Sequence, residues 1–223
     1  MEIIARIRNG FSEKFGVPRQ SGLADGVISR VVFEPKYRDP EALRGIEGFS
    51  HLWLLWEFDG VKNHDWSPTV RPPRLGGNER MGVFATRSPY RPNNIGLSSV
   101  RLCGVEDGPS GKELIVAGAD LADNTPILDI KPYIPFTDSH PDASGGFTDT
   151  RDYPRLEVDI PDGIASSLPP ETLRAVRQIL SLDPRPAYQD DPERVYGLTY
   201  AGYDVRFTVK DGRLTVVGVT RVR

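Results

Sequence analysis

The sequence predicts a mainly β fold with a closed or nearly closed β structure followed by a small α+β unit. Strand-like runs recur through the first 150 residues between clusters of Gly, Pro, Asn and Asp, whereas one amphipathic helix and one hairpin follow them. The alternation of strand and helix that marks a Rossmann fold is absent. A chain of 223 residues has room for a domain of about 150 residues and a smaller companion.

In the first part, strands are expected at residues 1–6, 27–33, 49–58, 81–86, 96–102, 113–120 and 127–130. One short helix is expected over 39–44, with Asp39 as its N-cap and Pro40 at its first position. Residues 138–153 are rich in Asp, Ser, Gly and Pro and are interpreted as a linker. The predicted domains are therefore 1–150 and 151–223.

The second part begins with a helix, predicted over 170–182 from the apolar stripe of Leu173, Val176, Ile179 and Leu180. A proline-rich connection, residues 183–186, follows it. Alternating apolar residues from 205 to 209 and the run 214–219 flank Asp211-Gly212, a strong two-residue turn signal. The sequence therefore predicts a hairpin at the end of the chain.

Composition restricts the function. The net charge of −3 excludes a nucleic-acid binder that works by overall charge, so a polyanion site must be local. The single cysteine, Cys103, excludes an intrachain disulfide and indicates a reducing, cytoplasmic setting. No apolar run reaches membrane-spanning length, so we expect no membrane partner.

The sequence lacks the motifs of several common classes of enzyme. The patterns G-x-G-x-x-G, G-x-x-x-x-G-K-[ST], H-E-x-x-H and G-x-S-x-G are all missing. The three histidines have no metal-ligand spacing, so we expect no metal. The sequence therefore argues against four activities: dinucleotide binding, P-loop hydrolysis, zinc proteolysis and serine acyl transfer.

Four polar loops lie at predicted strand ends: residues 15–20, 66–78, 82–99 and 123–133. Their arginines suit a carboxylate or phosphate, and their aspartates suit a sugar diol or an ammonium group. A zwitterionic nucleoside fits both. The alternative is structural, since arginines in proline-rich loops also bind backbone carbonyls.

Four segments closely resemble the TrmO family, also called TsaA-like or YaeB-like proteins: KFGVPRQSGLA, FSHLWLLW, PTVRPPRLGGNERMGVFATRSPYRPNNIGLSSVRL and GADLADNTPILDIKPYIPFTDSHPDAS. LDPRPAYQ resembles the second domain of the family. The resemblance implies a closed, TsaA-like β-barrel over 1–150 that binds S-adenosylmethionine, and a small α+β domain over 151–223. It implies a homodimer that methylates N6 of threonylcarbamoyladenosine beside the anticodon, with the tRNA anticodon arm as partner.

The same resemblance assigns cofactor contacts to Pro18, Arg19, Gln20, Asp59, Gly60, Arg87, Leu97, Asp123, Asn124, Thr125 and Pro126. The family usually has histidine where this chain has Asp59, and glycine where it has Asn124. Glycine adopts a left-handed backbone more easily than asparagine does.

Methyl transfer also needs a proton acceptor for the nitrogen. The candidates are Asp129, Tyr133 and Asp138, with His140 as a further possibility, and the first two are equally compatible with orienting or structural roles. Candidates for contacts to the substrate phosphate or carboxylate are Arg71, Arg91 and Lys131, for which a surface ion pair is the alternative.

Two other functions stay open on the sequence. One is a small-molecule methyltransferase built on the same barrel, and the other is a non-catalytic RNA-binding barrel whose arginines meet only phosphate.

Overall fold

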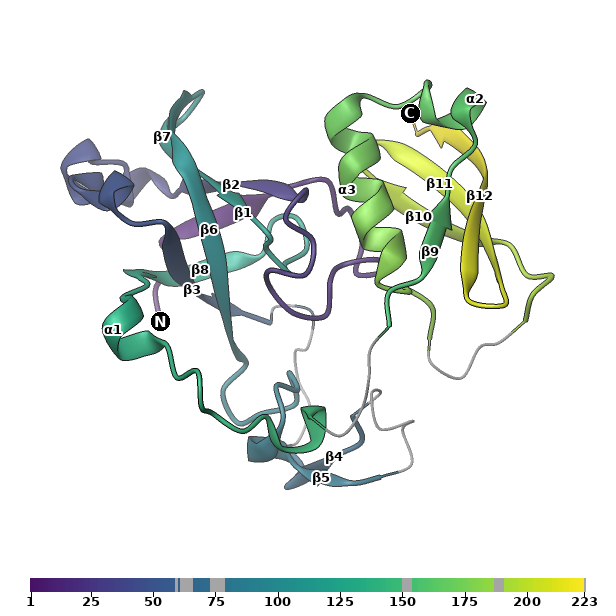
Figure 1. Cartoon of the computed structure of the whole chain (residues 1–223). Coiled ribbons are helices and arrows are strands. Elements are labelled where there is room, and N and C mark those ends of the chain that lie inside the picture. Colours follow the sequence, from purple (N-terminus) through teal and green to yellow (C-terminus); the bar gives the residue numbers. More distant parts are fainter. Residues whose placement is uncertain (59, 61–65, 73–78, 150–153, 187–190, 223) are drawn as a thin grey trace.

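The computed structural model describes residues 1–58, 60, 66–72, 79–149, 154–186 and 191–222, which form two β-rich parts joined by a long connection (Figure 1). The strands of the first part are β1 (Ala5–Arg8), β2 (Ile28–Phe33), β3 (His51–Glu57), β4 (Thr69–Val70), β5 (Met81–Gly82), β6 (Ile95–Gly108), β7 (Gly111–Ala117) and β8 (Pro126–Pro132). The connection carries α1 (Pro135–Asp138). The second part contains β9 (Glu157–Asp159), α2 (Asp162–Ala165), α3 (Pro170–Ser181), β10 (Tyr196–Tyr200), β11 (Tyr203–Lys210) and β12 (Arg213–Arg221).

Six strands of the first part pair in a closed order, β1-β2-β7-β6-β3-β8, and every pairing is antiparallel. The ring closes through a short seam in which Ala5 pairs with Ile127 and Arg6 with Pro126. The mainly β prediction is confirmed, and the ring of strands supports the predicted barrel.

Alternation along β3 shows how the sequence fills this ring. Leu52, Leu54 and Trp56 are buried, whereas the residues between them face outward and are partly exposed. Full burial of an aliphatic side chain of this size stabilises the fold by roughly 1.5–3 kcal/mol. Gly96 lies opposite Trp56 in the ladder, and a Cβ there would come within 2.2 Å of the indole. A glycine is therefore required beside this tryptophan.

The strand expected at residues 1–6 covers Ala5–Arg8 instead, and two other predicted elements of the first part differ in type. The helix at 39–44 is a short 3-10 turn, Pro40–Leu43, capped by Asp39 as expected and ended by Gly45 in the left-handed region. The predicted strand 81–86 is wrong beyond Gly82, because Val83–Ala85 form a 3-10 turn. The backbone N–H of Val83 still donates to the Pro68 carbonyl, in register with the β4–β5 pairing. Proline has no N–H to donate in return, so the ladder is not continued beyond this bond.

The second part has the predicted α+β character. Its sheet has the order β10-β11-β12-β9, with β9 parallel to β12, and α3 packs against it. The predicted hairpin joins β11 to β12, and Asp211 and Gly212 at its turn have φ of 49° and 76°. These values suit a two-residue turn that matches the strand twist.

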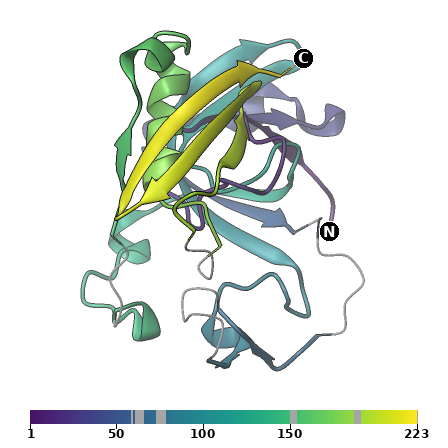
Figure 2. The same cartoon turned by 90° about the vertical axis from the view of Figure 1, so that its right-hand side faces the viewer.

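The hydrophobic cores cross the predicted boundary at residue 150. One core belongs to the ring of strands. The other joins α3 and the second sheet to Phe11, Ala24 and Val27 from the segment between β1 and β2. Figures 1 and 2 show α3 between that sheet and the first part of the chain. The segment 9–27 therefore belongs structurally to both parts.

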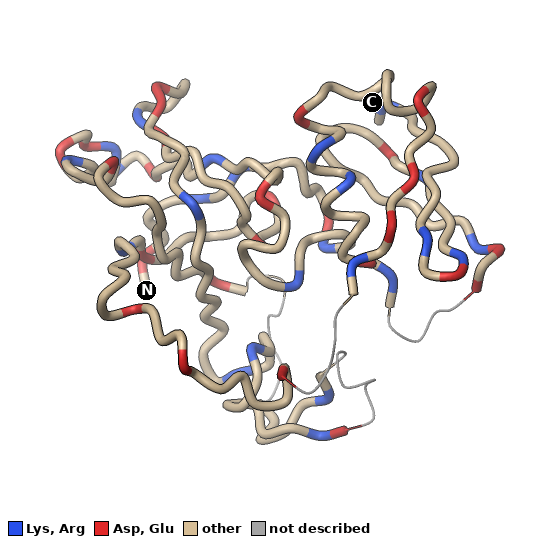
Figure 3. Tube along the Cα trace, viewed as in Figure 1, with Lys and Arg blue, Asp and Glu red and all other residues tan. Residues whose placement is uncertain are grey.

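Lys and Arg positions alternate with Asp and Glu positions along both described parts (Figure 3). Any recognition of a polyanion must therefore depend on a few placed side chains. In the described part of the chain, no helix has the length and apolar character needed to cross a bilayer.

Candidate functional site

The first predicted ligand loop, residues 15–20, lies between the ring of strands and α3; with the adjoining Lys14 it is called the loop 14–20 below. Pro18 is buried, and the Gln20 side-chain amide donates to the Arg19 carbonyl (2.6 Å). Arg87, from the loop before β6, donates to Gln20 Oε1 (2.7 Å). Arg19 donates in the other direction, to the carbonyl of Arg185 after α3 (3.2 Å). The structure thus brings together four residues assigned to the cofactor from the sequence.

Gly60 adjoins the same loop. A Cβ built on it would lie 2.0 Å from Lys14 Nζ, so the chain after β3 passes directly beside residue 14. Asp59, which the sequence also assigns to the cofactor, lies outside the described residues.

The loop 123–126 is anchored on the end of β1. Asp123 accepts the backbone N–H of Asn9 (2.9 Å) and pairs with Arg8 (3.4 Å). Asn124 has φ of 66°, which is the left-handed conformation that glycine adopts with less strain. Thr125 is buried and donates to the Ala122 carbonyl, and the buried Pro126 begins β8. This loop has a fixed backbone with one carboxylate at its start.

Asp120 is a residue of the site that the sequence interpretation missed. The buried Ser98 hydroxyl accepts from Trp56 Nε1 (2.9 Å) and donates to Asp120, which also accepts from the backbone of Ser21. Burial raises the pKa of the Asp120 carboxyl, and nearby Arg87 partly opposes this. The available signal was its position just after the buried strand β7.

Arg91, in the loop before β6, and Leu97, on β6, lie in different environments. Arg91 donates to the carbonyls of Val83 (3.0 Å) and Thr86 (2.7 Å) and lies over the Phe84 ring. It therefore stabilises the loop that carries Arg87. Leu97 is 48% exposed on β6, next to the buried Ser98, and is accessible to a ligand or a partner.

The three candidate proton acceptors differ in their partners. Asp129 accepts the N–H of Ile130 (2.9 Å) and forms an ion pair with Lys131 (2.9 Å). Tyr133 packs against Trp53, with ring centroids 5.5 Å apart. Their assignment as acceptors stays a prediction.

Asp138 has a more defined structural environment. Its carboxylate accepts from the Ile134 backbone and from Trp53 Nε1, both at 2.9 Å. These hydrogen bonds, with that of Ile134 as the largest cause, lower the pKa of Asp138. A carboxylate with a lowered pKa is a weaker proton acceptor.

The candidate substrate cations are exposed, Arg71 just after β4 and Lys131 on β8. Among the described residues, no three His, Cys, Asp or Glu side chains gather closely enough to hold a metal ion. The site therefore offers guanidinium groups at Arg19 and Arg87, carboxylates at Asp120 and Asp123, and an amide at Gln20. This set suits a ligand that carries both a positive and a negative charge.

Comparisons with known proteins agree with this chemistry. The model of the tRNA-methyltransferase O N-terminal domain matches residues 6–139, and that of the TrmO C-terminal domain matches residues 154–222. Proteins named tRNA (adenine(37)-N6)-methyltransferase are 49% identical over 175 residues in Eikenella corrodens (78% of this chain, 98% of the relative) and 41% identical over 223 residues in Escherichia coli K12 (96% and 95%). A crystal structure of TrmO from Pseudomonas aeruginosa aligns with a TM-score of 0.80 at 33% identity, covering 98% of this chain and 96% of that one.

Proposed function

Because the chain belongs to the TrmO family, we propose that it transfers a methyl group from S-adenosylmethionine to N6 of adenine 37 in tRNA. The chain is thus an S-adenosylmethionine-dependent tRNA methyltransferase. We further propose that the acceptor is threonylcarbamoyladenosine, in which N6 is a ureido nitrogen.

The observation that carries the proposal is the contact between Arg87 and Gln20 (2.7 Å). It joins two loops that are 67 residues apart in the sequence and that the family resemblance assigns to the same cofactor. The buried Ser98 and Asp120 lie beside them.

The residues fit S-adenosylmethionine by charge and by polarity. The cofactor carries a carboxylate, an ammonium group, a sulfonium, a ribose diol and an adenine. Arg19 and Arg87 suit the carboxylate, whereas Asp120 and Asp123 suit the diol or the ammonium group. Gln20 can both donate to and accept from a polar ring edge.

When bound, the cofactor supplies an electrophilic methyl group. The chain's main contribution is to align donor and acceptor, a proximity effect that can lower a barrier by roughly 7–11 kcal/mol. The proton on the acceptor nitrogen must also leave. We propose Asp129, Tyr133 and Asp138 as the groups that accept or relay it, and the lowered pKa of Asp138 favours an orienting role for that residue.

The remaining assignments concern the partners. We propose that three cations bind the phosphates of the anticodon arm or the threonyl carboxylate of the modified adenosine: Arg71, Arg91 and Lys131. The C-terminal domain is proposed as a second contact to the tRNA. A homodimer is also proposed. Leu97, which is exposed on β6, stays proposed as a cofactor contact. The proposed location is the cytoplasm, where tRNA is modified.

A calorimetric titration with S-adenosylmethionine tests the cofactor assignment. The chain should give saturable heat, whereas a non-catalytic RNA-binding barrel should give none. Arg87→Ala should weaken binding at least about tenfold, because a hydrogen bond to a charged group contributes roughly 1.5–3 kcal/mol. Arg213→Ala is the control, since it removes an exposed ion pair with Glu157 on the second sheet. Unchanged affinity in Arg87→Ala would show that this side chain is wrongly assigned.

Methyl transfer to tRNA tests the acceptor. Radiolabelled methyl should enter tRNA that carries threonylcarbamoyladenosine, and not the same transcript without that modification. Mass analysis of tRNA from cells lacking the gene should show loss of the methylated nucleoside. If it persists and no second enzyme makes it, a small-molecule methyltransferase becomes the better assignment.

A further inference from the structure

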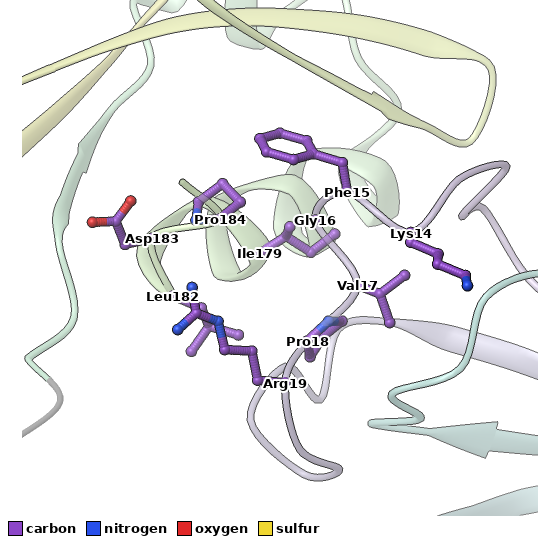
Figure 4. Close-up of a pocket in the computed structure, with 10 residues that line it drawn as sticks. All are labelled: Lys14, Phe15, Gly16, Val17, Pro18, Arg19, Ile179, Leu182, Asp183 and Pro184. Atoms are coloured by element: carbon purple, nitrogen blue, oxygen red, sulfur yellow. The ribbon is translucent and has the colours of Figure 1, made fainter. Parts of the chain in front are cut away.

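A pocket of about 220 Å³ lies where the loop 14–20 meets the end of α3 (Figure 4). Pro18 and Arg19 line it from one side, and Ile179, Leu182 and Pro184 from the other. Pockets that enclose a whole drug-sized ligand measure roughly 300–1,000 Å³. This one can hold one end of a ligand of that size, between walls from both domains.

Arg19 crosses this junction. Figure 4 shows its side chain extending toward Leu182 and the turn after α3. There Arg19 Nη2 donates to the Arg185 carbonyl (3.2 Å), the contact that fixes the guanidinium from the C-terminal side. Through Gln20 the same loop is held by Arg87 from the barrel side.

The turn that presents this carbonyl is built in an unusual way. Asp183 has φ of 49°, a left-handed conformation that disfavours most side chains. Its carboxylate binds Arg185 through Nε (2.8 Å) and Nη2 (2.9 Å), and the Arg185 side chain is only 11% exposed. A bidentate pair of this kind has a defined geometry. The turn is therefore held rigid just where it meets Arg19.

We propose that the C-terminal domain completes the methyl-donor site, with Asp183 as a positioning residue that acts through Arg185 on Arg19. The inference rests on the function proposed above and extends it. The C-terminal domain then forms one wall around the end of S-adenosylmethionine that Arg19 binds. A second contact holds the end of the segment 9–27 to the C-terminal domain, because Gln178 on α3 accepts the Gly26 N–H (2.6 Å) and donates to Asp25 (2.5 Å).

The test compares two aspartates that each pair with the arginine two residues further along the chain. Asp183→Ala removes the carboxylate that fixes the turn. Asp204→Ala is the matched control, since Asp204 also pairs with the arginine two residues on, Arg206 (2.7 Å), but on β11 and outside the pocket lining. Titration with S-adenosylmethionine should give a Kd raised roughly tenfold in Asp183→Ala and changed less than about twofold in Asp204→Ala.

Steady-state kinetics separate positioning from general loss of structure. In Asp183→Ala the KM for S-adenosylmethionine should rise by a similar factor, whereas kcat at saturating cofactor and the KM for tRNA should stay within about twofold. Asp183→Asn tolerates a left-handed backbone and keeps one acceptor oxygen, so it should lose roughly threefold in affinity and provides the test if Asp183→Ala does not fold.

Equal affinities in wild type and Asp183→Asn or Asp183→Ala would overturn the inference, as would equal losses in Asp183→Ala and Asp204→Ala or a loss confined to kcat. Wild-type protein is titrated first. If the wild-type protein gives no saturable heat, the proposed function itself is contradicted. If the wild type binds S-adenosylmethionine and Asp183→Ala binds it equally well, only this inference is contradicted.

Discussion

At the residue scale, Asp120, which follows β7, and Asp138, the last residue of α1, illustrate how the environment shifts the pKa of a carboxyl group. Burial raises the pKa of Asp120, which lies among the residues proposed to hold the cofactor. Hydrogen bonds from Ile134 and Trp53 lower the pKa of Asp138. Desolvation disfavours the charged form, whereas donors stabilise it. Ionisation of Asp120 therefore costs more free energy in the folded chain than in the unfolded one, and raised carboxyl pKa values of this kind are common at functional sites.

Asp120 gives a prediction for the pH dependence of stability. Its pKa is raised on folding, so its contribution to stability is present below the ordinary value of about 3.9 and is lost as the pH rises through the folded pKa. Asp120→Asn does not ionise. The difference in Tm, variant minus wild type, should therefore be more positive at pH 7.5 than at pH 4.5. Thermal unfolding at both pH values measures it, and a difference that is the same at both would contradict the shift.

At the element scale, the loop between β5 and β6 is an ordered support for Arg87. Val83–Ala85 form a 3-10 turn, and Arg91 bonds to the carbonyls at both ends of the stretch from Val83 to Thr86. Prolines at 89 and 92 restrict the chain around Arg91. A loop that is already ordered loses less entropy when a ligand binds.

Removing the Arg91 side chain should therefore loosen this loop without unfolding the protein. In Arg91→Ala, tryptic cleavage after Arg87 should be faster by roughly tenfold, since two charge-assisted hydrogen bonds are lost, while Tm should fall by less than about 4 °C. Arg91→Lys should be intermediate, because lysine lacks the planar fork. Arg213→Ala is the control, and equal cleavage rates in Arg91→Ala and this control would show that Arg91 does not hold the loop.

The sequence predicts an element well when neighbouring residues specify it, and poorly when contacts with distant residues decide it. The turn at Asp211-Gly212 is specified by two adjacent residues, and it was predicted correctly. The predicted strand beyond Gly82 was not, because the partner strand has a proline at position 68, which cannot donate a ladder hydrogen bond, and because Arg91 binds the carbonyls of Val83 and Thr86. Asp120 was missed for the same reason, since its burial under Ser98 is created only by the closed ring of strands.

At the scale of the whole molecule, the two β-rich parts of the chain are joined by direct contacts. Phe11, from the segment after β1, packs on Tyr200 of the second sheet, with ring centroids 5.0 Å apart. Arg174 and Gln178 on α3 bind Asp25 from the same segment. Each part thus contributes to the stability of the other, and we expect a single cooperative transition.

Gly16 tests this coupling. It has φ of 86°, and a Cβ there would lie 2.1 Å from Leu198 Cδ1 in the core of the second part. Gly16→Ala should lower the free energy of unfolding by about 2–4 kcal/mol, from backbone strain and overpacking together. Gly22→Ala is a matched control, because Gly22 has φ of 78° but no atom within 4 Å of the added Cβ. It should cost about 1–2 kcal/mol from strain alone.

Tryptophan fluorescence reports on unfolding of the first part of the chain, because all three tryptophans lie before residue 67. If the two parts unfold together, tryptophan fluorescence and far-UV circular dichroism of Gly16→Ala should give one coincident transition, shifted further than that of Gly22→Ala. A fluorescence transition that stays at the wild-type temperature while circular dichroism shows an earlier step would mean that the second part unfolds alone. The shared segment 9–27 would then fail to transmit stability from the C-terminal core to the ring of strands.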